Sequence, residues 1–184
     1  MVATDSIADL SVYGIGVANN GGGTDGQEYT FDSISVSSGD HILVARSISA
    51  MTAYFDACYN EFDHVLVATS SISQNGDDAI ELFYNGNVIE TFGDINVDGT
   101  GTPWDYMDSW AYKVDGLWTY WGVDCTDGST TTSTSNCPYP LCPPPPSSPF
   151  LPGARASRAR RSIVLAAHHF PATSQTVCLD LRSL

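Results

Sequence analysis

The sequence predicts an all-β fold on three observations. Its apolar residues come in short runs, many of which alternate with polar residues, and turn-forming glycine, asparagine and aspartate separate these runs. Only one segment has a helical pattern. A chain of 184 residues has room for one domain of ordinary size. Several short strands with few helices favour a β-sandwich or a barrel.

Short apolar runs mark the expected strands. They are Leu10–Val17, Glu28–Val36, Asp40–Ala45, Val65–Ala68, Ala79–Tyr84, Val88–Phe92, Trp110–Val114 and Leu117–Trp121. Asn85-Gly86 stands between two alternating runs and is the strongest hairpin signal, because this dipeptide readily adopts positive φ. Asp115-Gly116 predicts a second hairpin in the same way. A slip in the alternation at Asp32 and Ser33 indicates a bulge.

One helix of one or two turns is expected between Ser49 and Cys58. Ser49 suits an N-cap, because its hydroxyl can accept a hydrogen bond from a free backbone N–H of the first turn. Met51, Tyr54 and Phe55 follow at helical spacing and would form its buried face.

The net charge of −14 is divided unevenly along the chain. Residues 1–142 contain 20 acidic and 2 basic residues, a net charge of −18, whereas residues 143–184 contain five arginines and one aspartate, a net charge of +4. An acidic body repels the phosphate backbone, so we expect it not to bind nucleic acid. Metal cations are more natural partners for it.

The composition changes after Cys142. The stretch PPPPSSPFLPG has the composition of a linker, and the arginine-containing segment behind it shares neither the acidity nor the turn pattern of the body. We therefore expect a folded domain over residues 1–142 and a disordered tail over residues 143–184. An alternative is that the tail is translated sequence that was never selected to fold.

Cys125 and Cys137 bracket a loop of Ser, Thr, Gly and Asp residues. Because this loop has no apolar anchor, a disulfide would offset its entropy, and it would imply an oxidising compartment. The alternative is a pair of reduced thiols in a cytosolic protein. The start MVATDSIADL has no signal-peptide pattern, so an extracellular or cell-surface location would need a signal outside this chain. The apolar runs are too short to span a membrane.

The segment from Asp94 to Asp105 resembles the start of a calcium loop. Side-chain oxygens at its first, third and fifth positions, followed by Gly99, can converge on one cation. The candidate ligands are Asp94, Asn96, Asp98, Thr100 and Asp105. The twelfth position is Asp105 rather than the longer Glu, and no helices flank the loop. The alternative is a β-turn whose Asp and Asn side chains bond their own backbone.

Two further patterns have a functional and a structural interpretation. Asn75-Gly76-Asp77-Asp78 holds paired acids, which suit a metal or acid–base chemistry, or form a turn in which Asp77 caps backbone amides. The aromatic residues between Trp104 and Trp121 suit either a carbohydrate-binding platform or the core of a small β domain.

From Ile7 to Cys142 the chain resembles a lamin-tail-type domain, in the form found in secreted bacterial and marine microbial proteins. The matching stretches are IADLSVYGIGVANNGGGTDGQEYTF, SISQNGDDAIELFYNGNVIETFGDINVDGTGTPWDYMDSWAYK and CTDGSTTTSTSNCPYP. The resemblance implies an immunoglobulin-like β-sandwich without enzymatic activity. Family members carry a strand before the first of these stretches, so we expect that strand to be missing here and to leave a sheet edge unpaired.

The expected function is that of a non-catalytic extracellular module for interaction, adhesion or targeting, with an unidentified protein or cell-surface partner and calcium as its candidate ligand. An alternative is an accessory domain of a secreted nuclease or other hydrolase whose catalytic part lies outside this chain. A third interpretation is a small metal-dependent hydrolase that uses Asp94, Asp98 and Asp105, although nothing in the sequence supplies its general base.

Overall fold

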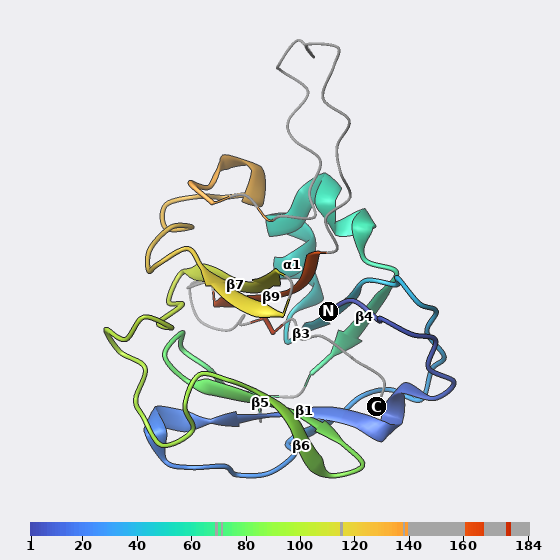
Figure 1. Ribbon diagram of the computed structural model, residues 1–184. Helices are drawn as coiled ribbons and strands as arrows, with labels where there is room; N and C mark the ends of the chain where they lie inside the picture. The colour runs from blue at the N-terminus through green and yellow to red at the C-terminus, as the bar shows by residue number, and fades with distance from the viewer. Residues whose placement is uncertain are drawn as a thin grey trace.

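The computed structural model describes residues 1–137 except 69, 71 and 115, together with residue 139 and the backbones of residues 161–167 and 176–177. Most of the regular structure in these residues is β-strand, arranged in two sheets (Figure 1). One α-helix and a few 3₁₀ turns complete it. The predicted β-rich class is therefore confirmed.

The first sheet has four antiparallel strands in the order β2-β1-β5-β6. Its strands are β1 (Tyr13–Ala18), β2 (Tyr29–Thr30), β5 (Ala79–Tyr84) and β6 (Asn87–Phe92). Asn85 and Gly86 have φ values of 48° and 76°, which is the geometry that the Asn-Gly signal predicts for this hairpin. β2 is much shorter than the expected strand. After Asp32 and Ser33, where the sequence predicts a bulge, Val36 forms an isolated β-bridge with Ile7.

The second sheet has six strands in the order β4-β3-β10-β9-β7-β8. Its strands are β3 (Ile42–Ala45), β4 (His64–Val67), β7 (Ser109–Val114), β8 (Leu117–Tyr120), β9 (Arg161–Ala167) and β10 (Thr176–Val177). β7 and β8 form the second predicted hairpin. The sheet is mixed, because β3 and β4 are parallel and the other neighbours are antiparallel.

The helix α1 (Ile48–Phe55) makes the parallel pairing of β3 and β4 possible. Parallel neighbours need a crossover, because a tight turn cannot return the chain to the same end of the sheet. The N-cap is Ser47, whose hydroxyl accepts a hydrogen bond from the Ala50 backbone N–H, and not Ser49 as expected. The helix buries Met51, Tyr54 and Phe55, as its spacing predicts.

The C-terminal tail differs from its prediction in two segments. Residues 161–167 and 176–177 were expected to lie outside the fold, but they form β9 and β10 and fill the sheet between β7 and β3. Residues 161–167 read RSIVLAA, and such an apolar, β-branched run can pair on both sides in the middle of a sheet. The remaining tail residues lie outside the described part of the chain.

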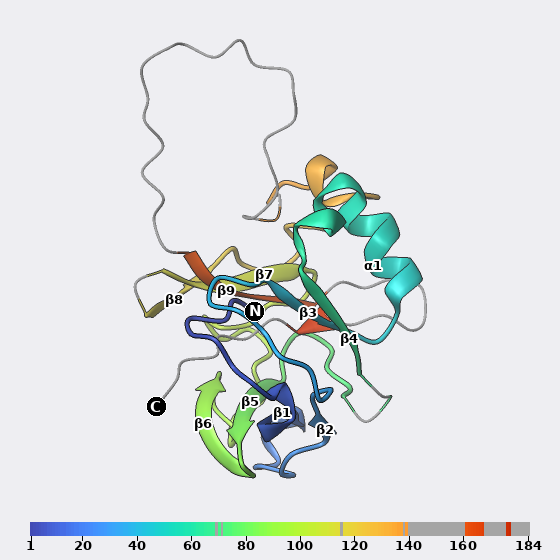
Figure 2. The ribbon, with the colours of Figure 1, turned by 90° about the vertical axis from the view of Figure 1, so that its right-hand side faces the viewer.

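Two cores separate three layers (Figure 2). The larger core lies between the sheets, with Ile15 and Leu82 from one and Ile42 and Val44 from the other. The second lies between the six-stranded sheet and α1 and contains the intervening β3 residues, with Leu43 among them. β3 is buried on both faces for this reason, and it reads as a continuous apolar run. The helical layer and the parallel pair are features that the immunoglobulin-like expectation did not include.

Candidate functional site

The loop from Asp94 to Asp105 connects β6 to β7, and its carboxylates are engaged with its own backbone. Asp94 Oδ1 accepts a hydrogen bond from the Asn96 N–H at 2.9 Å. Asp98 Oδ1 accepts another from the Thr100 N–H at 3.0 Å, which holds the pKa of the exposed Asp98 carboxyl below its usual value. These are the contacts of an Asx-rich turn.

Asp105 closes the end of the loop. Its Oδ2 accepts a hydrogen bond from the Gly101 N–H at 2.8 Å, and its Oδ1 lies 3.2 Å from the N–H of Met107, which donates to it. The side chain is buried. Both carboxylate oxygens therefore serve the backbone, and this residue fixes the approach of the loop to β7.

Thr100 joins the loop to the turn before β5. Its hydroxyl lies 2.8 Å from Asp98 Oδ1 and 2.7 Å from Asp77 Oδ2. A hydroxyl has one proton, so Thr100 donates to one of these carboxylates at a time. The other oxygen of Asp77, Oδ1, is buried without a hydrogen-bond partner among the described residues. Sequence reasoning missed this contact, because the two segments are more than twenty residues apart.

Asp78, rather than Asp77, caps the turn. Its Oδ1 accepts from the Asn20 N–H at 2.8 Å and its Oδ2 from the Asn75 N–H at 3.1 Å. Burial raises the pKa of this carboxyl, the two N–H donors oppose the rise, and the neighbouring charges of Asp77 and Asp98 add to it. The acids that gather here are therefore Asp77, Asp78 and Asp98.

Tyr106 is buried next to these acids. Its hydroxyl donates to the backbone carbonyl of Asp78 at 3.1 Å and lies 3.4 Å from Gln74 Oε1. Burial raises the pKa of the Tyr106 hydroxyl well above its usual value, and the nearby carboxylates make a smaller contribution in the same direction. The phenol therefore stays protonated and donates.

The three acidic calcium candidates, Asp94, Asp98 and Asp105, do not form a cluster in the described part of the chain. Within the part of the chain that the structure describes, no group of three or more His, Cys, Asp or Glu side chains has the arrangement of a metal site. Asp94, Asp98 and Asp105 each bond the turn beside them, and the side chain of Asn96 is exposed. Calcium binding stays a prediction.

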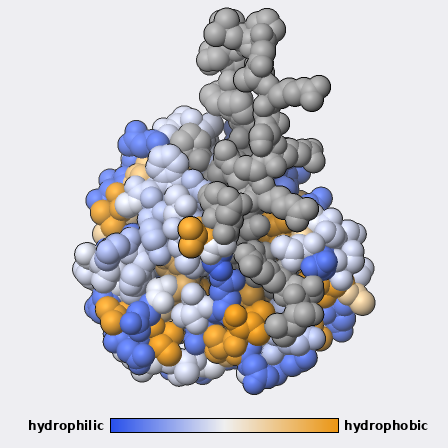
Figure 3. All heavy atoms as spheres, viewed as in Figure 1, coloured by the Kyte–Doolittle hydropathy of each residue, from blue (hydrophilic) through white to orange (hydrophobic). Residues whose placement is uncertain are grey.

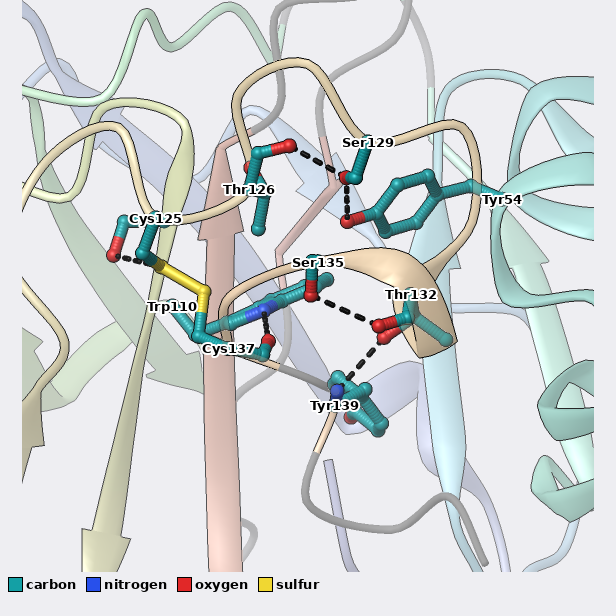
Figure 4. The surroundings of a disulfide bond; sticks show 10 residues. Tyr54, Trp110, Cys125, Thr126, Ser129, Thr132, Ser135, Cys137 and Tyr139 are labelled. Atoms are coloured by element: carbon teal, nitrogen blue, oxygen red, sulfur yellow. Dashed lines mark hydrogen bonds between the residues drawn. A yellow bond between two sulfur atoms is a disulfide. The ribbon is translucent and has the colours of Figure 1, made fainter. Parts of the chain in front are cut away.

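The disulfide loop is the second candidate region (Figure 4). Cys125 and Cys137 are joined as the sequence predicts, with their Cα atoms 5.7 Å apart. Trp110 of β7 lies below the loop, and its indole Nε1–H donates to the backbone carbonyl of Cys137 at 2.7 Å. Cys58, in the 3₁₀ segment that follows α1, is also disulfide-bonded.

Hydroxyl groups fasten the rest of this loop. The Tyr54 hydroxyl of α1 lies 3.1 Å from Ser129 Oγ, and the buried Thr132 hydroxyl accepts from the backbone N–H of Tyr139 at 2.7 Å (Figure 4). The Tyr139 ring packs on Phe55, with ring centroids 4.9 Å apart. The loop thus covers the second core through one covalent bond and several polar contacts.

The aromatic residues between 104 and 121 differ in how deeply they are buried. Tyr106 and Trp110 are buried and belong to the two cores, which supports the structural interpretation for these residues. Tyr120 and Trp121 are exposed at 39% and 49%. Trp104, Tyr112 and Trp118 are half-buried. The sequence signal did not separate buried from exposed rings, because burial depends on which sheet face each strand presents.

Comparison of the chain with protein-family models, with characterised proteins and with solved structures found no match. Among the described residues, no helix has both the length and the apolar character needed to cross a membrane.

Proposed function

We propose that this protein is a non-catalytic interaction module of the extracellular space or cell surface. The observation that carries the proposal is the Cys125–Cys137 disulfide, which closes a polar loop over the buried Trp110. Structural disulfides persist in oxidising compartments and are rare in the cytosol. The net charge of −18 over residues 1–142 adds solubility and favours cationic partners.

The assignment to the lamin-tail type, with an immunoglobulin-like topology, belongs to this proposal. It is supported by the long matching sequence blocks, and the two facing sheets are compatible with it. Calcium is proposed as a stabilising ligand near Asp98, where Asp77 and Asp78 add to the local negative charge. An accessory role beside a secreted nuclease or hydrolase uses the same module and differs only in the neighbouring domain.

Two measurements on the full chain, exported with an added signal peptide, test the proposal. The expected result is saturable binding to intact bacterial cells that disappears after the cells are treated with protease. No turnover of DNA, RNA or ester substrates is expected, with or without calcium. Hydrolysis that Asp98→Asn abolishes would overturn the proposal in favour of a metal-dependent hydrolase, and absence of saturable binding would overturn the interaction role.

A further inference from the structure

The edge strand β8 lacks the usual protection against pairing with another chain. The two sheets end in β2, β6, β4 and β8. β2 has two residues, β6 carries Glu90 and pairs with β5 across a register shift, and β4 begins with His64, which bonds Asp40 at 2.9 Å. β8 reads LWTY, without charge or proline. Edges normally carry charges, prolines or bulges, because exposed backbone groups recruit further strands.

The backbone of β8 presents unpaired groups on one side. The Trp121 N–H donates to the Trp110 carbonyl at 3.3 Å, and Ala111 stands opposite Tyr120. Antiparallel pairs alternate between bonded and non-bonded positions. The N–H and C=O groups of Trp118 and Tyr120 therefore point away from β7, and no described strand lies on that side (Figure 2).

The side chains around this edge are apolar, and their two faces differ. Trp118 and Tyr120 pack toward the other sheet, where their rings lie 4.7 Å and 6.1 Å from that of Phe92. The opposite face exposes Leu117 at 74% and Trp121 at 49%. The first pair holds the strand in place, and the second pair is free to bury a partner's side chains.

Exposed apolar residues concentrate in this part of the chain. Leu117, Tyr120, Trp121 and Val123 lie within seven consecutive residues, and Met107 lies beside them, because its carbonyl accepts from the Asp124 N–H at 2.9 Å. The other large apolar side chains that are exposed among the described residues are Val67, Val88 and Val97, which are far apart in the sequence. On the face drawn in Figure 3, apolar groups lie among hydrophilic ones. Such a concentration of exposed apolar side chains suits a protein-binding site.

Charge indicates which partner fits this edge. Residues 104–139 carry Lys113 as their only basic residue, and Lys113 is already paired with Glu90. The same segment carries five aspartates, Asp105, Asp108, Asp115, Asp124 and Asp127. A second copy of this acidic chain would be repelled at the edge, whereas a cationic segment would be attracted.

We propose that β8 docks an extended, lysine- or arginine-bearing segment of a partner protein by strand addition. The partner's backbone bonds the outward groups of Trp118 and Tyr120, and its apolar side chains cover Leu117 and Trp121. Its cationic side chains are attracted by the negative charge of this acidic chain, to which the exposed Asp124 and Asp127 contribute. The inference rests on the proposed interaction function and names the surface and the chemistry of the partner.

The test uses the full chain and a synthetic nonapeptide that alternates valine with lysine. Calorimetry is expected to show that this peptide binds, that its glutamate analogue does not, and that binding weakens as salt rises. N-methylation of one alternating set of peptide amides is expected to abolish binding, and methylation of the other set to preserve it. Equal binding of both methylated peptides would overturn strand addition.

Variants locate the site. Leu117→Lys and Trp121→Lys are each expected to weaken peptide binding by roughly tenfold or more, because each removes apolar contact and adds like charge. Val88→Lys places the same charge on the edge strand β6 at a side chain of 42% exposure, and it serves as the matched control. If this control lost as much affinity as the β8 variants, general electrostatics would replace the proposed site. Self-association that the β8 variants abolish would assign the edge to a second copy instead.

Binding to intact cells separates this inference from the proposed function. Cell binding that persists in both β8 variants would overturn the assignment to β8 and leave the interaction function in place. Peptide binding at β8 without any saturable cell binding would overturn the interaction function and leave the strand-accepting edge.

Discussion

Trp110 Nε1 donates a hydrogen bond of 2.7 Å to the backbone carbonyl of Cys137. Cys137, which closes the loop through its disulfide with Cys125, is therefore also the residue at which β7 holds the loop. Trp110 is buried, and its ring packs 5.1 Å from that of Tyr139. One side chain of β7 thus holds the covering loop onto the second core.

Replacement of this indole is expected to be costly. Trp110→Phe leaves the Cys137 carbonyl without its donor and opens a small cavity, so the free energy of unfolding should fall by about 2–4 kcal/mol. Urea denaturation measures the change. The control is Trp121→Phe at an exposed position, with an expected change within about 0.5 kcal/mol. Equal stability of Trp110→Phe and wild type would contradict the anchoring role.

The disulfide itself should stabilise the fold through the entropy of its loop. The cysteines are 12 positions apart, and a loop of this size corresponds to about 3 kcal/mol in the chain-entropy description. The double variant Cys125→Ser/Cys137→Ser is expected to lose roughly this amount in non-reducing urea titrations. Reducing agent is a poor substitute for the variant, because it would also open the disulfide of Cys58. A midpoint unchanged from wild type would argue that the loop is held by its polar contacts alone.

An ion pair connects the two sheets. Lys113 of β7 bonds Glu90 of β6, and the two side chains are only 12% and 15% exposed. Lys113→Met leaves a largely desolvated carboxylate without a partner and should cost about 3 kcal/mol. The double variant Lys113→Met/Glu90→Leu is expected to recover much of that loss, because no buried charge remains. A double variant as unstable as Lys113→Met would show that the unpaired Glu90 carboxylate does not cause the loss.

Two neighbouring carboxylates should act in opposite directions on the pH dependence of stability. The pKa of Asp98 is lowered, so its contribution is present above its unfolded pKa and is lost as the pH falls through the folded value. The pKa of Asp78 is raised, mainly by burial, so its ionisation opposes folding increasingly as the pH rises through the folded value. Asp98→Asn and Asp78→Asn should each remove the pH dependence of stability that the replaced carboxylate contributes.

These slopes are measured as differences between wild type and variant in denaturation from pH 2.5 to pH 7, a range of about one to three units around the reference carboxyl pKa. The expected difference grows with pH for Asp98→Asn and shrinks with pH for Asp78→Asn. The same sign for both variants would refute the contrast between an exposed, backbone-bonded carboxylate and a buried one.

Calcium should raise the melting temperature if it binds near Asp98. Binding to the folded state alone stabilises it by about 2.7 kcal/mol at a hundred-fold excess over Kd. Chelator should reverse the shift, magnesium should do less, and Asp98→Ala should abolish the difference. Asp127→Ala, an exposed acid outside this loop, is the control and should keep it. Equal melting temperatures in millimolar calcium and in chelator would exclude calcium binding and leave only the turn interpretation of this loop.

Local features of this protein were determined by the sequence. Residues close together in the sequence predict the Asn85-Gly86 hairpin, the β7–β8 hairpin and the buried face of α1. The Cys125–Cys137 bond likewise closes a short loop. In each case φ preferences, alternation or a short connection favour one arrangement before any tertiary contact forms.

The tertiary structure alone decided which distant segments meet. The parallel pairing of β3 with β4, the insertion of β9 beside β7 and the contact of Thr100 with Asp77 join residues far apart in sequence. The physical reason is that local preference fixes a strand's alternation but not its neighbour. The neighbour depends on which pairing buries the most apolar surface of the whole chain and leaves the fewest backbone groups unbonded.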